Sequence, residues 1–213
     1  MQQVPSTTAI LCDFMEIAFH TILYTRRIYP PEIFERRRKF GIPVHLSRHP
    51  DLSKYLVDVV CGIQSWLEAD TLQKVVLAVL GPQNQDNNTP SVIERFVFNL
   101  TLSREQEQAG QRLNLTQIQQ LEEKLRASLL KLQVCDAKVP ALPLGSTFTV
   151  LLYTDTDDQS KQDWFAIEER ELVEVPRELY HIPIKSVNTD LFQIQIHMEN
   201  KNLEYQASEN VAD

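Results

Sequence analysis

The sequence has little glycine and none of the common catalytic signatures. Its five glycines are scattered among 213 residues, and none belongs to a GxGxxG or GxxxxGK[ST] pattern, the loops that cradle phosphate groups. HExxH and GxSxG, which mark many zinc peptidases and serine hydrolases, are also absent. These absences argue against an enzyme and favour a binding protein.

Cysteine is scarce as well. Cys12, Cys61 and Cys135 are far apart, odd in number and form no CxxC pair, which fits a reducing compartment such as the cytosol or nucleus. A nucleophilic dyad of Cys61 with a distant histidine has no supporting pattern. Cys61 falls beside the apolar stripe of an expected helix, so we interpret it as a packing residue.

No long hydrophobic run is free of charge. The most apolar segment, 9–28, contains Asp13, Glu16, His20 and Arg26, whereas a membrane span needs about 20 nearly uncharged residues. We therefore expect a buried helix there and no membrane partner. The first residues, MQQVPSTTAI, lack the basic region of a signal peptide.

Patterns for metal binding are weak. Asp155, Asp157 and Asp158 lack the glycine and distal glutamate of a calcium loop. His45 and His49 are four residues apart, but neighbouring prolines disfavour a helix that would bring them onto one face. The sequence therefore predicts no metal and no cofactor.

Positive charge is concentrated in one stretch. Residues 24–50 contain seven Lys and Arg and two Glu, a net charge of +5 in a chain of net charge −8. The acidic remainder argues against general nucleic-acid binding, which needs a basic face. We interpret the stretch as a helix end, a double-proline stop and a basic connector that meets acidic protein surface. Direct DNA binding through 26–48 remains an alternative.

Hydrophobic periodicity predicts an α+β fold with mainly antiparallel strands. The expected elements are helices from Thr7 or Thr8 to about Ile28, at Leu52–Leu67 and at Leu115–Leu132, and strands at Lys74–Leu80, Val92–Leu102 and 146–154. The last strand is expected to be half-buried to central in its sheet. Four short extended runs with polar joints follow, and the tail after Glu199 is polar.

Six stretches resemble the HORMA domain family, and in particular its DNA polymerase zeta branch. They are CDFMEIAFHTILYTRRIYP, IFERRRKFGIPVHLSRHPDLSKYL, KVVLAVL with ERFVF, LRASLLKLQVCDA, GSTFTVLLYT and IPIKSVNTDLFQIQI, in the family's order. The resemblance implies one HORMA domain over 1–198, with a core at 9–154, a C-terminal "safety belt" at 155–198 and a flexible tail at 199–213. The fold implied is three helices packed on an antiparallel sheet.

HORMA domains hold a partner's "closure motif" peptide under the safety belt. By resemblance, the peptide-binding residues here are Tyr55, Phe148, Val150 and Trp164. Backbone pairing at a sheet edge would give affinity, and aromatic side chains would act as anchors. Tyr55 also lies on an apolar helical stripe, so plain core packing is its alternative explanation.

Two further surfaces follow from the resemblance. A hairpin at the end of the belt would dock the C-terminal domain of the Rev-one translesion polymerase through Leu179, His181, Gln195 and His197. His197 departs from the family, which often has tyrosine there, and an ordinary exposed strand face is the alternative.

A HORMA homo- or heterodimer would use Arg27, Arg36, Arg126 and Ala137. Solvated helix surface is the alternative for Arg126. The family also implies an AAA+ ATPase that remodels the clamp, and a nuclear location with some cytoplasmic protein.

The predicted function is therefore a non-enzymatic adaptor. It would trap a proline-containing peptide of the catalytic subunit of DNA polymerase zeta and bridge it to translesion or break-repair factors. The alternatives are a spindle-checkpoint regulator of the anaphase-promoting complex and, in another class, a direct DNA-binding protein.

Overall fold

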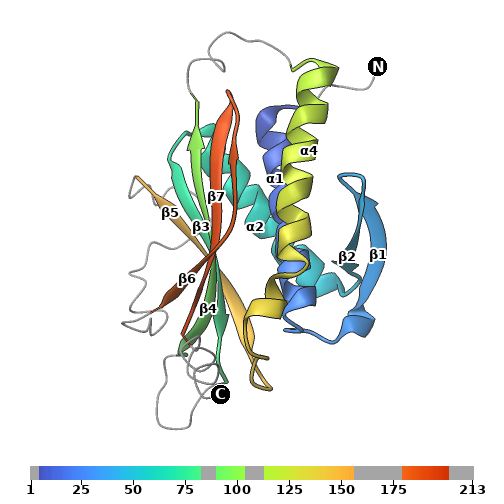
Figure 1. The fold of residues 1–213 in the computed structure, drawn as a ribbon, viewed down its shortest axis with the longest axis vertical. Helices are drawn as coiled ribbons and strands as arrows, with labels where there is room; N and C mark the ends of the chain where they lie inside the picture. The colour runs from blue at the N-terminus through green and yellow to red at the C-terminus, as the bar shows by residue number, and fades with distance from the viewer. Residues whose placement is uncertain (1–4, 83–89, 104–112, 156–178, 202–213) are drawn as a thin grey trace, which may run out of the picture.

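The computed structural model describes residues 5–82, 90–103, 113–155 and 179–201 (Figure 1). Its elements are α1 (Thr7–Thr25), η1 (Pro31–Ile33), β1 (Phe34–Lys39), β2 (Ile42–Ser47), α2 (Pro50–Glu68), β3 (Leu72–Leu80), β4 (Val92–Leu102), α4 (Leu115–Leu132), η2 (Cys135–Lys138), β5 (Thr147–Thr154), β6 (Tyr180–Asn188) and β7 (Phe192–Asn200). The predicted α+β class is confirmed. The described helices pack on a five-stranded antiparallel sheet.

Helix α1 is the central helix and is buried along most of its length. Its N-cap is Ser6, whose hydroxyl accepts a hydrogen bond from the Ala9 amide at 3.1 Å, so the predicted caps Thr7 and Thr8 lie one and two residues too late. The helix ends at Thr25, three residues before the predicted end. Among the described residues, no helix combines the length and apolar character needed to cross a membrane.

The segment predicted as a basic connector is a β-hairpin. Strands β1 and β2 pair antiparallel from Phe34↔Ser47 to Lys39↔Ile42. Phe40 and Gly41 form the two-residue turn with φ of 47° and 74°, and positive φ at both central residues matches the twist of a hairpin. The hairpin lies on the opposite side of the helices from the large sheet (Figure 1).

The other two helices follow their predicted stripes. In α4 the apolar stripe faces inward, with Leu121, Leu125, Leu129 and Leu132 buried. Asn114 and Gln117 form a capping box, each side chain bonding the other's backbone N–H. Helix α2 begins at Pro50, where the missing N–H costs nothing in a first turn.

The sheet has the strand order β5-β3-β4-β7-β6. The predicted hairpin of β3 and β4 is confirmed by their antiparallel pairing. Strand β5 is half-buried as predicted, but it is not central, because among the described strands it pairs with β3 alone. The hairpin of β6 and β7 occupies the opposite edge, where β7 pairs with β4.

The two faces of the sheet bury different groups. Phe96, Phe98 and Ile196 face the helices and join the main core with α1, α2 and α4. The other face carries a smaller apolar cluster that includes Val76 and Val97. Alternation along β4 and β7 therefore places one set of side chains under the helices and the other on the far face.

A buried charged pair joins the end of α1 to the end of β7. Arg26 donates to both carboxylate oxygens of Glu94 at 2.9 and 2.7 Å and to the Pro140 carbonyl at 2.7 Å. Asn200 donates from its side-chain amide to Glu94 at 3.0 Å. Strand β7 thus runs two residues beyond 198, into what looked like a polar tail, where Glu199 pairs with Arg95 and Asn200 bonds Glu94.

Candidate functional site

An aromatic group lies where β5 begins. The Phe148 ring meets Tyr55 of α2 edge-on at 5.6 Å and Tyr29, just before η1, at 6.1 Å between ring centroids. Val150, two residues further along β5, points the same way and is buried. Three of the four predicted peptide-binding residues are thus close together, while Trp164 lies outside the described residues.

Beside this group is an open hollow of about 650 Å³. Its lining is mostly apolar and comes from the segment between α1 and η1, from η1, from the start of α2 and from β5: Tyr29, Pro30, Ile33, His49, Asp51, Leu52, Tyr55, Phe148 and Thr149. Tyr55 is 40% exposed although it lies on the apolar stripe of α2. A residue used only for core packing would be covered, so Tyr55 is placed to contact something outside the core.

Tyr55 is held against the strand by its hydroxyl. Burial raises its pKa, and hydrogen bonds with the Val150 backbone and the Thr149 side chain oppose this, with a net rise. Burial also raises the pKa of Tyr29. Both hydroxyls are therefore neutral at physiological pH and can donate hydrogen bonds beside the backbone of β5.

Several lining residues were not predicted. Tyr29 and Pro30 belong to a segment that the sequence indicated only as a double-proline stop, and His49 was considered only as a metal ligand together with His45. Their shared location depends on the turn at η1, which brings the chain back across the start of β5. The Tyr-Pro-Pro sequence at 29–31 was the available signal.

The predicted docking hairpin exists as β6 and β7. Gln195 and His197 lie on β7 on the face turned away from the helices, and His181 lies on that face of β6. Gln195 and His181 are exposed and His197 is half-buried, while Leu179 immediately precedes β6 and is half-buried. The structure therefore brings His181, Gln195 and His197 onto one face.

Glu199 is an unpredicted member of this face. Arg95 approaches one of its carboxylate oxygens at 3.1 Å, and His197 approaches the other at 3.3 Å. Burial acts to raise the pKa of Glu199, but the His197 hydrogen bond and the charges of Arg95 and His181 outweigh it, and the net pKa is lowered. The carboxylate is ionised at neutral pH.

Arg126 has an internal partner as well as its predicted dimer role. Its Nε donates to the Phe40 carbonyl at 2.7 Å, so α4 is tied to the turn of the β1–β2 hairpin. A Cβ at Gly41 would lie 3.2 Å from Arg126 Nη2, which adds to the need for glycine at this positive φ. The side chain is half-buried rather than fully solvated.

The other predicted dimer residues are exposed. Arg27 follows α1 with a φ of 53°, and Ala137 lies in η2. Arg27 and Asp136 line the same hollow of about 550 Å³, so the segments of Arg27 and Ala137 are neighbours. Arg36 lies on β1 opposite His45, in the other part of the basic stretch.

The cysteines are free thiols. Burial raises the pKa of Cys12 and of Cys135 to about 12, so neither is a nucleophile at neutral pH. Cys61 is exposed on α2, so the prediction that it is a packing residue is wrong. It faces away from the core because the adjacent stripe residues, Val59 and Ile63, take the buried positions.

Sequence comparisons show the family of this chain. The model described as "HORMA domain" matches residues 8–190. The "Mitotic spindle assembly checkpoint protein MAD2B" of Danio rerio is 34% identical over 201 residues, which cover 90% of this chain and 90% of that protein. The "DNA polymerase zeta processivity subunit" of Arabidopsis thaliana is 30% identical over 198 residues, covering 91% and 85%.

Solved structures have the same fold. The "Crystal Structure of Mitotic Checkpoint Complex" includes a chain with a TM-score of 0.74 at 22% identity, covering 92% of this chain and 98% of that chain. C. elegans HTP-2 bound to a HIM-3 closure motif has a TM-score of 0.69 at 14% identity, covering 92% and 90%.

Helices packed on a five-stranded antiparallel sheet, with β5 as the terminal described strand beside an aromatic hollow, give the chain a fold of the HORMA class. The chain belongs to the HORMA domain family and is a homologue of MAD2B-type proteins and of the polymerase zeta processivity subunit. HORMA domains are non-catalytic adaptors, in agreement with the prediction that this chain is not an enzyme.

Proposed function

We propose that the chain is a HORMA adaptor that captures an extended, proline-containing peptide of the catalytic subunit of DNA polymerase zeta along β5. The observation that carries the proposal is the terminal position of β5 beside the hollow at Tyr55 and Phe148. The similarity to a relative named as a polymerase zeta subunit supports this choice of partner. The nucleus is the proposed place of action.

Strand addition explains the arrangement at β5. A terminal strand offers backbone N–H and C=O groups to an incoming chain, and pockets beside the strand select its side chains. Phe148, Tyr29 and Tyr55 provide an apolar, rigid wall suited to a proline ring or an aliphatic side chain. Asp51 and His49 supply the polar groups at the rim.

The sheet order supports a clamp. Strand β5 ends at Thr154 on one edge, and β6 begins at Tyr180 on the other. The intervening strands make the sheet about 19 Å wide at the usual strand spacing. A peptide on β5 would therefore lie at one edge of the sheet, while the β6–β7 hairpin is fixed at the opposite edge. A belt that encloses the peptide needs these two positions to be far apart.

The proposal predicts that the aromatic wall carries much of the affinity. Tyr55→Ala and Phe148→Ala are each expected to weaken peptide binding by about 2 kcal/mol, roughly 30-fold, because buried aromatic anchors dominate such interfaces. Fluorescence anisotropy with labelled proline-containing segments of the polymerase subunit measures the affinity. A pull-down with peptide mapping by mass spectrometry selects the segment to label.

Val57→Ala is the matched control, because Val57 is an exposed apolar residue of the same helix, α2, and does not line the hollow. Thermal unfolding of each variant separates loss of binding from loss of fold. If both aromatic variants fold and bind the peptide like the control, the peptide does not lie along β5.

The β6–β7 hairpin is the proposed second docking surface, for the C-terminal domain of the Rev-one polymerase. His181, Gln195 and His197 share one face there, away from β5, so both partners can bind at once. Gln195→Ala should then weaken this second partner and leave capture of the peptide unchanged. This pattern defines a bridging adaptor.

A spindle-checkpoint role is the second candidate, favoured by the name of the MAD2B relatives. It uses the same strand-addition site with another partner. Competition between the polymerase peptide and mitotic partners in the pull-down discriminates the two roles.

A further inference from the structure

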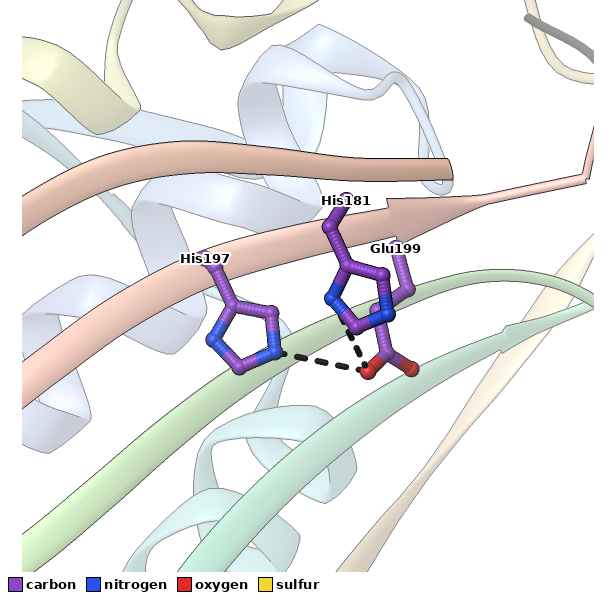
Figure 2. A group of neighbouring side chains, drawn as sticks. All are labelled: His181, His197 and Glu199. Carbon is purple, nitrogen blue, oxygen red and sulfur yellow. Dashed lines mark hydrogen bonds and ion pairs between the residues drawn. The ribbon is translucent and has the colours of Figure 1, made fainter. Parts of the chain in front are cut away.

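Three side chains with metal-binding groups converge on the far face of the β6–β7 hairpin. His181 Nδ1 and His197 Nε2 lie 3.7 and 3.3 Å from the same oxygen, Glu199 Oε1. One ligand atom from each residue lies within 4.8 Å of the others. Figure 2 shows both imidazole rings directed at that one carboxylate oxygen.

The strands fix this arrangement. His181 and Glu199 are directly opposite each other across β6 and β7, and His197 lies two residues before Glu199 on the same face. On the other side of β7, Arg95 of β4 is the cross-strand neighbour of Glu199 and pairs with Oε2 at 3.1 Å. The pairing orients the carboxylate so that Oε1 faces the two histidines.

We propose that His181, His197 and Glu199 form a Zn²⁺ site on this hairpin. Around a tetrahedral zinc ion with bonds of about 2.0–2.1 Å, neighbouring ligand atoms are roughly 3.3–3.4 Å apart. The two nitrogen-to-oxygen distances lie at or close to this value, so a bound ion requires only small side-chain movements. Two imidazoles with one carboxylate suit zinc better than the oxygen-seeking magnesium or calcium ions.

The fourth position of the ion faces outward. The His181 side chain is 64% exposed, whereas those of His197 and Glu199 are 22% and 11% exposed. Water therefore has access to the open position, as it does in zinc sites with three protein ligands. Since the site lies on the proposed second docking surface, a donor side chain of a docked protein can take the place of this water.

The competing arrangement is a metal-free cluster in which the histidines donate hydrogen bonds to Glu199. The metal-free cluster and the zinc site use the same three residues, so zinc binding must be measured directly. The exposed thiol of Cys61 can also bind zinc as a thiolate and would confuse the titration. The test therefore uses the full chain without a histidine tag and with Cys61→Ser in every variant.

The experiment is a titration with ZnCl₂ against a chromophoric chelator, which gives stoichiometry and affinity. We expect one high-affinity ion per chain. His181→Ala and His197→Ala should each weaken it by at least about tenfold, since loss of even an outer-shell partner usually costs that much. His49→Ala is the matched control, because His49 is exposed and lies on another element, and it should bind zinc like the parent.

Imidazole ¹⁵N NMR identifies the ligand atoms. Zinc should shift His181 Nδ1 and His197 Nε2 and leave the rings of His45 and His49 unchanged. The His181 variant removes an exposed side chain, so it keeps the result interpretable if the His197 variant unfolds. Absence of zinc binding, or binding that is equal in the His181 and His49 variants, overturns the proposal. The test needs no peptide and is independent of the proposed function.

Discussion

At the scale of single residues, the buried pair of Arg26 and Glu94 is the strongest electrostatic feature of the core. Both side chains are almost fully covered, at 3% and 1% exposure. A buried charge is tolerated only while its hydrogen-bonding partners remain, and breaking such a pair is costly. Asn200 completes this set from the end of β7, so the last strand is joined to α1 through one carboxylate.

Asn200→Ala is expected to lower the free energy of unfolding by about 1–3 kcal/mol, because Glu94 Oε1 loses a buried hydrogen-bond donor. Urea unfolding followed by circular dichroism measures this. Lys201→Ala, at the next and exposed position, is the matched control and should be nearly neutral. Equal stability of the two variants would mean that Asn200 is not a structural anchor.

His20 predicts a pH dependence of stability. Burial lowers its pKa from 6.5 to about 4, and its Nδ1 accepts a hydrogen bond from the Ser47 amide at 3.2 Å. The unfolded chain therefore takes up a proton near pH 6.5 while the folded chain remains neutral. The contribution of neutral His20 to the free energy of unfolding is fully present above pH 6.5 and is lost as the pH falls towards 4. Between pH 7 and pH 5 the loss is about 2 kcal/mol.

The measurement is urea unfolding of the wild type and of His20→Asn between pH 7.5 and 5. The asparagine oxygen can accept the Ser47 hydrogen bond but does not titrate, so the variant should lose less stability on acidification. The difference between the two proteins removes the contribution of His45, whose pKa is lowered by burial and by Arg36. Parallel pH profiles would contradict a neutral, buried His20.

The sequence indicated some residues of the candidate site and missed others. Tyr55 and Phe148 were assigned through family resemblance; the structure shows their rings in contact, and their role in peptide binding stays a prediction. Tyr29 was missed because its place beside Phe148 depends on how the chain turns after α1. Glu199 was assigned to a polar tail, since a sequence does not show that a charged residue has a charged partner on a neighbouring strand.

At the scale of elements, regular hydrophobic spacing predicted the helices and the β3–β4 hairpin well. The β1–β2 hairpin was missed for a physical reason. Its strand β1 has five polar residues in succession, and β2 contains Pro43, which is tolerated at an edge but weakens the strand signal. Ile42 and Val44 are buried on one face of the hairpin although the register places them opposite Lys39 and Arg37, so charged residues lie on both faces and no alternating pattern marks the strands.

Substitution of Arg126 tests two roles of α4, in dimer formation and in holding the turn of the β1–β2 hairpin. Arg126→Ala should abolish dimers of the peptide-bound protein if the predicted interface is correct, and should loosen the hairpin turn because the bond to the Phe40 carbonyl is lost. Sedimentation velocity reports the first effect and hydrogen exchange at 38–42 the second. Lys131→Ala on the same helix is the exposed control.

The two readouts separate the interpretations of Arg126. Faster exchange with an unchanged dimer would remove Arg126 from the interface and leave it as a structural residue. An unchanged exchange rate would show instead that the Phe40 contact contributes little to the hairpin.

At the scale of the whole molecule, the proposed function gives the two edges of the sheet separate tasks. A peptide held at β5 under a belt that is anchored at β7 should leave slowly, because release requires local opening of the chain. Displacement of a labelled peptide by excess unlabelled peptide measures the rate. Asn200→Ala should accelerate release, since it removes the bond that fixes the end of β7 to Glu94. Lys201→Ala should leave the release rate unchanged. Equal rates in the two variants would exclude a role of the Asn200–Glu94 contact in peptide retention.

The terminal position of β5 also has a consequence for the behaviour of the protein in solution. Its sequence, TFTVLLYT, has no charge, proline or glycine, the composition of segments that assemble into intermolecular sheets. Edge strands are usually protected from such pairing by charges, prolines or a covering element. A captured peptide would protect β5, so we expect the chain to be more soluble, and less prone to aggregate on concentration, when it is co-expressed with its ligand.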